Sequence, residues 1–287
     1  MFKPLTVLGK KLMLTESEWN PKVMVGRAIV AILPEATVHR VKKSYYAHLL
    51  KNAPEDWQET DAGVVRRLVH AGDNVIDIGA SIGGYTKFLS RLVGSSGHVY
   101  SFEPNPPIYD FLSYNVRKLE LDNVTLCDAA LSDAAGFAEI AIPRYRWGSE
   151  CHYDATLETN RAAPDCRRAQ VRVNTLDSFF VDHSERISFI KCDVNYHELA
   201  CVRGALQTIR GSKPAILIEI LPDPDKPGSR AAQLFELLQE IGYDAHCFDG
   251  THLHRRQTGE HSQNYFFLRP EHLNALPRDF VIGFVTG

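Results

Sequence analysis

The sequence predicts an α/β fold: a doubly wound, mostly parallel sheet with helices on both faces. Short apolar runs rich in β-branched residues alternate with stretches in which apolar residues recur at helical spacing. A glycine-rich turn joins the first run, residues 75–78, to the first such helix, residues 85–93. Several runs also end in a carboxylate, and ligands of doubly wound sheets bind beyond the carboxyl ends of the strands. We therefore expect a binding site where these acids meet.

The composition is that of a soluble globular protein. The chain has 287 residues, enough for one large domain or a domain with an appendage. Its net charge of −3 argues against a general nucleic-acid binder. The six cysteines form no C-x-x-C pair, and several lie in apolar runs, as reduced core cysteines do. We expect a cytoplasmic protein without a signal peptide or a membrane span.

Residues 1–60 are expected to form a helical N-terminal appendage. They combine short apolar runs with a basic stretch over residues 39–51, and Pro21, Pro34 and Pro54 divide them into pieces. The appendage would pack on the core or on a second subunit, which would make the protein a homodimer. A lid over a substrate site is the alternative. The remaining domain, residues 61–287, begins with a helix over residues 63–70.

The glycine-rich turn indicates the cofactor. Gly79, Gly83 and Gly84 follow the spacing G-x-x-x-G-G, which differs from the G-x-G-x-x-G fingerprint of dinucleotide-binding folds. The acid Asp77 would also meet a dinucleotide pyrophosphate unfavourably. S-adenosylmethionine carries an ammonium and a sulfonium but no phosphate, so it suits this turn better than NAD. The candidate cofactor-binding residues here are Asp77, Gly79, Ala80, Ser81, Gly83, Tyr85 and Thr86.

The next two strands add further candidate cofactor contacts. The strand over residues 98–103 ends in Glu103, about twenty residues beyond the turn, where an acid accepts hydrogen bonds from a ribose diol in this class of fold. Asn105 follows, and prolines over residues 104–107 start the next helix. The third strand, residues 123–131, carries Asp128 and Ala130 near its end. Glu103, Asn105, Asp128 and Ala130 therefore complete this part of the predicted site.

Residues 132–170 are expected to form an irregular insertion. A strand-like run over residues 137–142 opens it, and the rest is rich in arginine, aromatic residues, histidine and cysteine. An insertion of about forty residues in a compact α/β domain is usually functional or flexible. Trp147 and His152 are candidate acceptor-binding residues, and a disordered surface loop is the competing interpretation.

The second half of the sheet is predicted from residue 187 onward. A fourth strand over residues 187–194 carries Asp193 near its end, and one helix through residues 202–209 follows. A fifth strand, residues 214–220, has Glu219 at its tip. A helix over residues 231–241 and two strands near residues 245–248 and 265–268 close the sheet.

In combination and in order, several motifs resemble those of the FkbM family of S-adenosylmethionine-dependent methyltransferases. The likeness covers roughly residues 60–270 and rests on V-I-D-I-G-A-S-I-G-G-Y-T (75–86), V-Y-S-F-E-P-N-P (99–106), N-V-T-L-C-D-A-A-L-S-D (123–133), T-L-D-S-F-F (175–180), I-K-C-D-V-N-Y-H-E-L (190–199) and R-G-A (203–205). The resemblance implies a Rossmann-like class I methyltransferase fold, with a seven-stranded, mostly parallel sheet whose last strand is antiparallel. It also implies O-methylation of a sugar or natural-product hydroxyl.

One departure from the family pattern falls beside the expected methyl-transfer site. Family members usually read D-V-E-G-x-E where this chain has D-V-N-Y-H-E over residues 193–198. Asn195 replaces the middle acid and Tyr196 replaces the glycine, so the acceptor pocket must differ in shape. Acceptor identity is therefore less transferable from the family than cofactor identity.

His197 is the candidate general base, because an alcohol is a poor nucleophile and imidazole titrates near neutrality. Asp193 and Glu198 would orient His197 or bind the acceptor, and Asp193 would also contact the cofactor. Tyr196 and Glu219 are candidate acceptor contacts. The competing interpretation of His197 is a partly buried histidine hydrogen-bonded at a helix start. Asp193, Glu198 and Glu219 could instead hold a divalent cation, but no further ligand is visible and no metal is expected.

Three other functions remain open from the sequence. They are an N-methyltransferase acting on a small molecule, a nicotinamide-dependent dehydrogenase, and a non-catalytic S-adenosylmethionine-binding partner protein. The spacing of the glycine turn argues against the dehydrogenase, whereas the altered segment 193–198 keeps the binding protein open. The expected partner is a small-molecule hydroxyl acceptor and not a nucleic acid.

Overall fold

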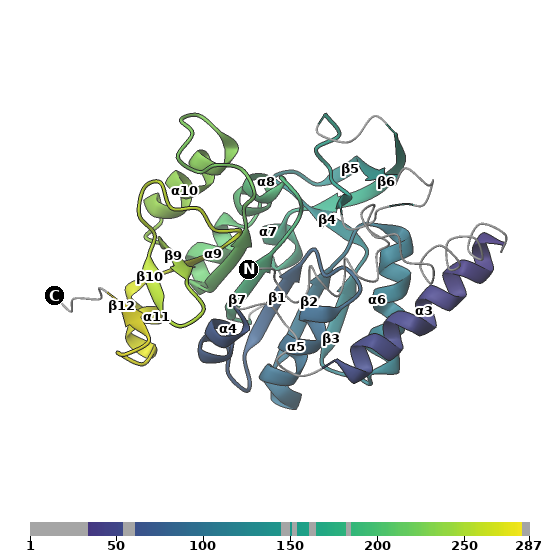
Figure 1. Ribbon diagram of the computed structural model, residues 1–287, viewed down its shortest axis with the longest axis horizontal. Coiled ribbons are helices and arrows are strands. Elements are labelled where there is room, and N and C mark those ends of the chain that lie inside the picture. The colour runs from purple at the N-terminus through teal and green to yellow at the C-terminus, as the bar shows by residue number, and fades with distance from the viewer. Residues whose placement is uncertain are drawn as a thin grey trace, which may run out of the picture.

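The protein is shown as a computed structural model in Figure 1, and its described residues are built around a nine-stranded sheet. The strand order is β12–β10–β9–β11–β8–β7–β1–β2–β3. The bounds are β1 (Asn74–Ile78), β2 (His98–Phe102), β3 (Val124–Cys127), β7 (Ile187–Cys192), β8 (Ala215–Glu219), β9 (Asp244–Phe248), β10 (Leu253–Arg255), β11 (Asn264–Leu268) and β12 (Val281–Ile282). The structure describes residues 34–53, 61–144, 150, 154–160, 165–181 and 185–282.

The strand directions confirm the predicted doubly wound, mostly parallel fold. Strands β3, β2, β1, β7 and β8 run parallel to one another, and β11 is antiparallel to both β8 and β9. The strand order reverses at β1, which pairs with β2 on one side and β7 on the other. Strands β10 and β12 extend the sheet beyond the seven strands expected, because runs of three and two residues are too short to show a periodicity.

Helices cover both faces of the sheet, as the alternating side chains of the central strands require. Ile76 and Ile78 of β1 pack on one face with α7, α8, α9 and α10, whereas Val75 packs on the other face with α4, α5 and α11. Asp77 shares the face of Val75 and so lies toward α5. The helix bounds are α4 (Ala62–Leu68), α5 (Gly84–Val93), η1 (Gly94–Ser96), α6 (Pro106–Lys118), α7 (Leu176–Phe179), α8 (Glu198–Arg203), α9 (Leu206–Ser212), α10 (Arg230–Glu240) and α11 (Pro270–Ala275).

The described part of the N-terminal appendage is a helix, α3 (Glu35–Asn52), which lies alongside α6 (Figure 1). The Asp110 carboxylate on α6 lies 2.7 Å from His39 Nε2 and 2.6 Å from Lys43 Nζ. Lys87 on α5 donates a hydrogen bond to the Leu50 carbonyl in the last turn of α3. The predicted helical character thus holds for this stretch, whereas residues 1–33 and 54–60 lie outside the described residues. The lid and dimer interpretations remain predictions.

A second sheet includes two parts of the segment expected to be irregular, one of them the strand-like run predicted over residues 137–142. In it β4 (Ala129–Leu131) runs parallel to β6 (Cys166–Asn174), and β6 is antiparallel to β5 (Gly136–Pro143). The predicted third strand over residues 123–131 is therefore two strands, because the chain leaves the main sheet after Cys127 and pairs with β6 from Ala129. Strand β6 was not predicted, although its exposed residues 168, 170 and 172 alternate with the more buried residues 169, 171 and 173, which is the pattern of a half-buried strand.

The single helix expected after residue 198 is in fact two, α8 and α9. Gly204 lies at the break, where a Cβ atom would stand 1.9 Å from the Ser132 carbonyl oxygen. The Gly204 carbonyl accepts a hydrogen bond from the Asp177 N–H instead of continuing a helix. This close approach to the chain after β4 leaves room only for glycine.

Two expectations drawn from composition can be compared with the described residues. Cys127, Cys166, Cys192, Cys201 and Cys247 are all free thiols, as expected, whereas Cys151 lies outside the described residues. Within the described part of the chain, no helix has the length and apolar character needed to cross a membrane.

Candidate active site

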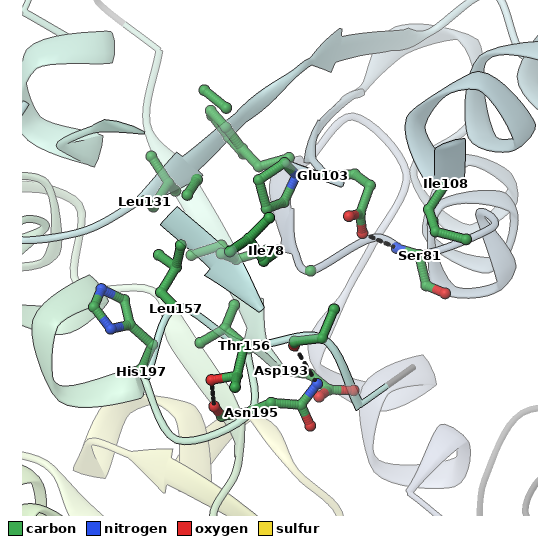
Figure 2. A pocket seen from close by; sticks show the side chains of 18 residues that line it. Ile78, Ser81, Glu103, Ile108, Leu131, Thr156, Leu157, Asp193, Asn195 and His197 are labelled. Carbon is green, nitrogen blue, oxygen red and sulfur yellow. Dashed lines mark hydrogen bonds between the residues drawn. The ribbon is translucent and has the colours of Figure 1, made fainter. Parts of the chain in front are cut away.

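A cavity lies at the carboxyl ends of β1, β2 and β7, next to the point where the strand order reverses. Figure 2 shows Glu103 on one side of this cavity, His197 on the other side, and Ile78 between them. Apolar residues such as Ile108 and Leu131 contribute to its walls. The position is the one expected for the ligand site of a doubly wound sheet.

The glycine turn brings the end of β1 against the end of β7. Gly79 has a φ of +78°, and a Cβ atom there would lie 1.9 Å from the Asp193 carbonyl oxygen. Gly83 has a φ of +97° at the N-cap of α5, and a Cβ atom there would lie 2.9 Å from Leu112 Cδ1. Position 79 therefore requires glycine for both conformation and space, whereas position 83 requires it for conformation, because the nearby Leu112 Cδ1 is the end of a side chain that can shift.

Glu103 lies at the end of β2 with its carboxylate against the glycine turn. Its Oε2 accepts a 2.9 Å hydrogen bond from the Ser81 N–H, and its Oε1 accepts one of 2.9 Å from the Asn105 N–H. Burial raises the pKa of Glu103 to about 7, although both N–H groups favour the charged form. Each oxygen still has a lone pair available. Glu103 can therefore accept hydrogen bonds from a diol in the cavity, which is its predicted role.

Asp77 on β1 and Thr86 on α5 lie on either side of the glycine turn in the chain and are joined to each other. Thr86 Oγ1 donates a 2.7 Å hydrogen bond to Asp77 Oδ2, and Asp77 Oδ1 lies 3.8 Å from Lys191 Nζ. Both side chains are fully buried, and neither residue lines the cavity in the described structure. Their geometry is that of support for the turn.

Lys191, on β7, is a buried cation beside the cavity for which the sequence suggested no role. Its Nζ donates hydrogen bonds of 3.3 Å to the Gly79 carbonyl and to Asp193 Oδ2, and lies 5.3 Å from the centre of the Tyr85 ring. Burial alone would lower the pKa of Lys191, but the nearby Asp193 and Asp77 carboxylates raise it. A lysine within an apolar strand was the available signal, since a buried ammonium needs carboxylate partners.

His197 is held at both ring nitrogens. Its Nδ1 lies 2.8 Å from Glu158 Oε1, and its Nε2 lies 2.9 Å from Ser132 Oγ. Burial would raise the pKa of Glu158, but hydrogen bonds from Arg230 and His197 outweigh that effect and lower it. An ionised Glu158 can only accept, so the proton of neutral His197 is on Nδ1. Nε2 is then the acceptor for the Ser132 hydroxyl.

The turn between β7 and α8 keeps a glycine-like backbone without a glycine. Asn195 has a φ of +51° and Tyr196 a φ of +76°, both in the left-handed region. Thr156 Oγ1 donates a 2.6 Å hydrogen bond to the Asn195 carbonyl, as Figure 2 shows. Glu198 Oε1 accepts a 2.9 Å hydrogen bond from the Tyr196 N–H. These contacts hold Tyr196 in the strained conformation that the glycine of the family pattern would adopt freely.

Several predicted site residues meet in the cavity, and others lie beside it. Those lining it are Gly79, Ser81, Glu103, Ala130, Asp193 and His197. Ala80, Gly83, Tyr85 and Asn105 belong to the turns or helix starts around it. Asp128 forms an ion pair with Arg172 on the exposed side of the second sheet.

The predicted acceptor and cation residues are more scattered. Tyr196 and Glu198 line a smaller hollow together with Arg230, and Glu219 ends β8. Asp193, Glu198 and Glu219 do not form a group that could share one ion within the described residues. Trp147 and His152 lie outside those residues. Glu158 and Ser132, which the sequence did not single out, are instead the partners of His197.

The chemistry of the cavity fits S-adenosylmethionine. Glu103 would hold the ribose diol, and the Asp193 carboxylate, 38% exposed, would attract the ammonium group. The apolar wall that includes Ile108 and Ala130 suits an adenine ring. Because the backbone at Gly79 lies so close to the Asp193 carbonyl that only glycine fits, no side chain projects from the turn at this position.

Comparisons with known proteins point to the same class. A family model described as the methyltransferase FkbM domain matches residues 77–245. The catalytic subunit of a tRNA (adenine(58)-N(1))-methyltransferase from Cryptococcus neoformans is 29% identical over 109 residues, which are 32% of this chain and 25% of that protein. A tRNA (adenine(58)-N(1))-methyltransferase from Thermus thermophilus is 33% identical over 109 residues, covering 35% of this chain and 43% of that protein. The matched part of this chain thus spans between a quarter and a half of the length of these relatives.

Among solved structures, an FkbM methyltransferase from Methylobacillus flagellatus is similar with a TM-score of 0.45 and 16% identity, over 70% of this chain and 44% of that chain. The family model covers more than half of the 287 residues, and it includes Glu103, Asp193 and His197. This chain therefore belongs to the FkbM methyltransferase family, and its cofactor is S-adenosylmethionine.

Proposed function

We propose that the protein transfers the methyl group of S-adenosylmethionine to a hydroxyl of a small molecule, such as a sugar or a natural product. The observation that carries the proposal is the position and the hydrogen bonding of His197. This residue lines the cofactor cavity, and its Nε2 already accepts a hydrogen bond from a hydroxyl, that of Ser132. When bound, the cofactor supplies an electrophilic methyl group on a sulfonium.

Glu158 supports His197 as a base in two ways. Its carboxylate, 2.8 Å from Nδ1, fixes the tautomer that leaves Nε2 free to take a proton. The same carboxylate stabilises the imidazolium that forms when Nε2 is protonated, as in other histidine–carboxylate pairs. Arg230 pairs with Glu158 and helps to keep it ionised. Glu158 is therefore a positioning residue for His197.

We place the acceptor hydroxyl where Ser132 now contacts His197, beside the cavity that His197 lines and Ser132 does not. The Ser132 hydroxyl lies 2.9 Å from His197 Nε2 and 3.2 Å from Asp133 Oδ1, so it has a second acceptor to which it can turn. An incoming hydroxyl then takes the Ser132 position at Nε2, within the reach that a general base requires. The rest of the catalytic task is to hold this hydroxyl in line with the methyl group.

A methyl-transfer screen tests the proposed acceptor class. The full chain is incubated with isotope-labelled cofactor and with hydroxylated glycosides, small amines or bulk tRNA, and the products are analysed by mass spectrometry. Label on a hydroxyl oxygen supports the proposal. Label only on nitrogen indicates an N-methyltransferase, and label only on tRNA refutes the small-molecule acceptor. Cofactor binding without transfer to any acceptor indicates a binding protein.

Variants test the roles of the residues. His197→Gln should lower turnover by about 10² to 10⁴, the usual contribution of a positioned base, with unchanged affinity for S-adenosylhomocysteine. Glu158→Gln keeps an acceptor for Nδ1 but removes the charge, so the acidic limb of the pH–rate profile should move to lower pH. His70→Gln, at an exposed histidine, is the matched control. Full turnover in His197→Gln would show that positioning alone suffices.

A further inference from the structure

Three side chains that commonly bind metals meet at the end of the molecule opposite α3. Cys247 lies on β9, His254 on β10 and Glu260 in the loop that follows; Figure 1 shows these strands far from α3. The antiparallel register places His254 directly opposite Cys247, so the two side chains leave the same face of the sheet. His254 Nε2 lies 2.6 Å from Glu260 Oε1, and one ligand atom from each residue lies within 4.8 Å of the others.

We propose that Cys247, His254 and Glu260 bind a divalent transition-metal ion of the zinc type. A thiolate sulfur, an imidazole nitrogen and a carboxylate oxygen are the three kinds of ligand that zinc takes in proteins. The sulfur ligand disfavours magnesium and calcium, which prefer oxygen. Three protein ligands leave the fourth tetrahedral position to water. Binding replaces the thiol proton of Cys247 with the metal and releases that proton to solvent.

The loop that carries Glu260 is fixed by contacts that do not involve the ion. Glu260 Oε2 accepts a 3.0 Å hydrogen bond from the Gln257 N–H, and Arg256 Nε donates one of 3.0 Å to the Glu260 carbonyl. Asp225 Oδ2 then accepts from Arg256 Nη2 at 2.6 Å and from the Gly259 N–H at 2.7 Å. The loop therefore needs little ordering when an ion binds, which limits the entropic cost.

The size and exposure of the site also suit an ion. His254 Nε2 and Glu260 Oε1 would have to separate from 2.6 Å to about 3.3 Å, the spacing of two tetrahedral ligands about 2.0 Å from zinc. Cys247 is buried, whereas the His254 and Glu260 side chains are 26% and 30% exposed. An ion can thus reach the site from solvent while its sulfur ligand stays protected. Once bound, it would join β9, β10 and the loop into one unit.

Metal titration of the full chain tests this site. The protein is stripped with a chelator, then titrated with Zn²⁺ against a chromophoric competitor and, separately, with Co²⁺. We expect one tight equivalent of Zn²⁺, a rise in melting temperature on its addition, and a near-ultraviolet thiolate-to-cobalt band with Co²⁺. Cys247→Ser and His254→Gln should each lower the affinity for Zn²⁺ more than about 100-fold. A loss of this size exceeds the one expected when a residue that only hydrogen-bonds to a metal ligand is changed.

Matched variants separate this site from other metal-binding groups. Cys166→Ser and His252→Gln change a cysteine and a histidine elsewhere and should bind Zn²⁺ like the wild type. Asp223, Asp225 and His261 form a second, more exposed group, so the titrations are repeated in His261→Gln. Each variant must still bind S-adenosylhomocysteine, which shows that it is folded. Absence of the thiolate-to-cobalt band in the wild type, or unchanged Zn²⁺ affinity in a folded Cys247→Ser or His254→Gln variant, overturns the proposal.

Discussion

Replacing Gly79 with alanine would displace residues of the cofactor site, in addition to lowering the stability of the protein. The new Cβ would stand 1.9 Å from the Asp193 carbonyl oxygen, whereas ordinary van der Waals contact begins at 3.4 Å. The glycine turn and the end of β7 must therefore move apart by about 1.5 Å, which is the shortfall between those two distances. Asp193 lines the cavity, so this movement displaces a predicted cofactor contact directly.

The effect of this displacement on activity can be separated from the cost of the backbone conformation, because a control variant carries the second cost alone. Alanine at Gly79 costs about 1–2 kcal/mol because its φ is +78°. Gly228→Ala pays a similar cost at a φ of +72°, but nothing lies within 4 Å of the added Cβ. Since a misplacement of 1 Å at a catalytic site costs about 10²-fold in rate, we expect Gly79→Ala to lose at least that much turnover. Cofactor affinity should also fall, whereas Gly228→Ala should retain both.

Calorimetry with S-adenosylhomocysteine at a temperature where both variants are folded is the decisive measurement. Circular dichroism and urea unfolding show first that each variant is folded at that temperature. If Gly79→Ala then binds S-adenosylhomocysteine as tightly as Gly228→Ala and turns over at the same rate, the close approach of the two strand ends does not set the site. The role assigned to the turn would then be wrong.

Three further predictions concern buried charges and the N-terminal helix. Because burial raises the pKa of Glu103 to about 7 and the charged form accepts better from a ribose diol, wild-type affinity for S-adenosylhomocysteine should fall as pH drops through 7; Glu103→Gln should show a flat profile by calorimetry. Burial also raises the pKa of Glu198 from 4.5 to about 7. The contribution of Glu198 to the free energy of unfolding is therefore full below pH 4.5, and about 3 kcal/mol of it is lost as pH rises from 4.5 through 7. Urea unfolding of Glu198→Gln across that window should show a smaller loss than the wild type; an equal loss would contradict the assignment. Lys87→Met leaves the Leu50 carbonyl without this donor and should weaken the docking of α3 by about 1–3 kcal/mol, seen as faster limited proteolysis within residues 34–53.

The sequence predicted the sheet and the position of the cavity because both depend on local patterns. The central strands are buried on both faces and read as mostly apolar runs, as in 75–78 and 187–192, each with one charged residue. Acids at the ends of such runs, including Glu103 and Asp193, must then meet at one edge of a parallel sheet. The glycines needed for the turn are visible as letters of the sequence.

The partners of His197 could not be predicted, because they depend on tertiary contacts. Glu158 and Ser132 are 39 and 65 residues away in sequence, and Glu158 lies in a segment without a clear periodicity. The sequence instead favoured Glu198, which is close in the chain but accepts from the Tyr196 N–H. Proximity in sequence within a turn does not determine which way a carboxylate points. Lys191 is a different case, since its burial could have been inferred from the strand around it.

The place of β7 in the sheet bears on how the chain folds during synthesis. Strand β1 meets β2 soon after it is made, but its other edge waits for β7, where Val75 pairs with Phe189. A nascent chain that ends before residue 187 would expose an unpaired apolar edge at the centre of its future core. Such edges pair readily with other chains, and long-range strand pairing is slow. N-terminal fragments are therefore expected to aggregate, and the centre of the sheet can be completed only after β7 has left the ribosome.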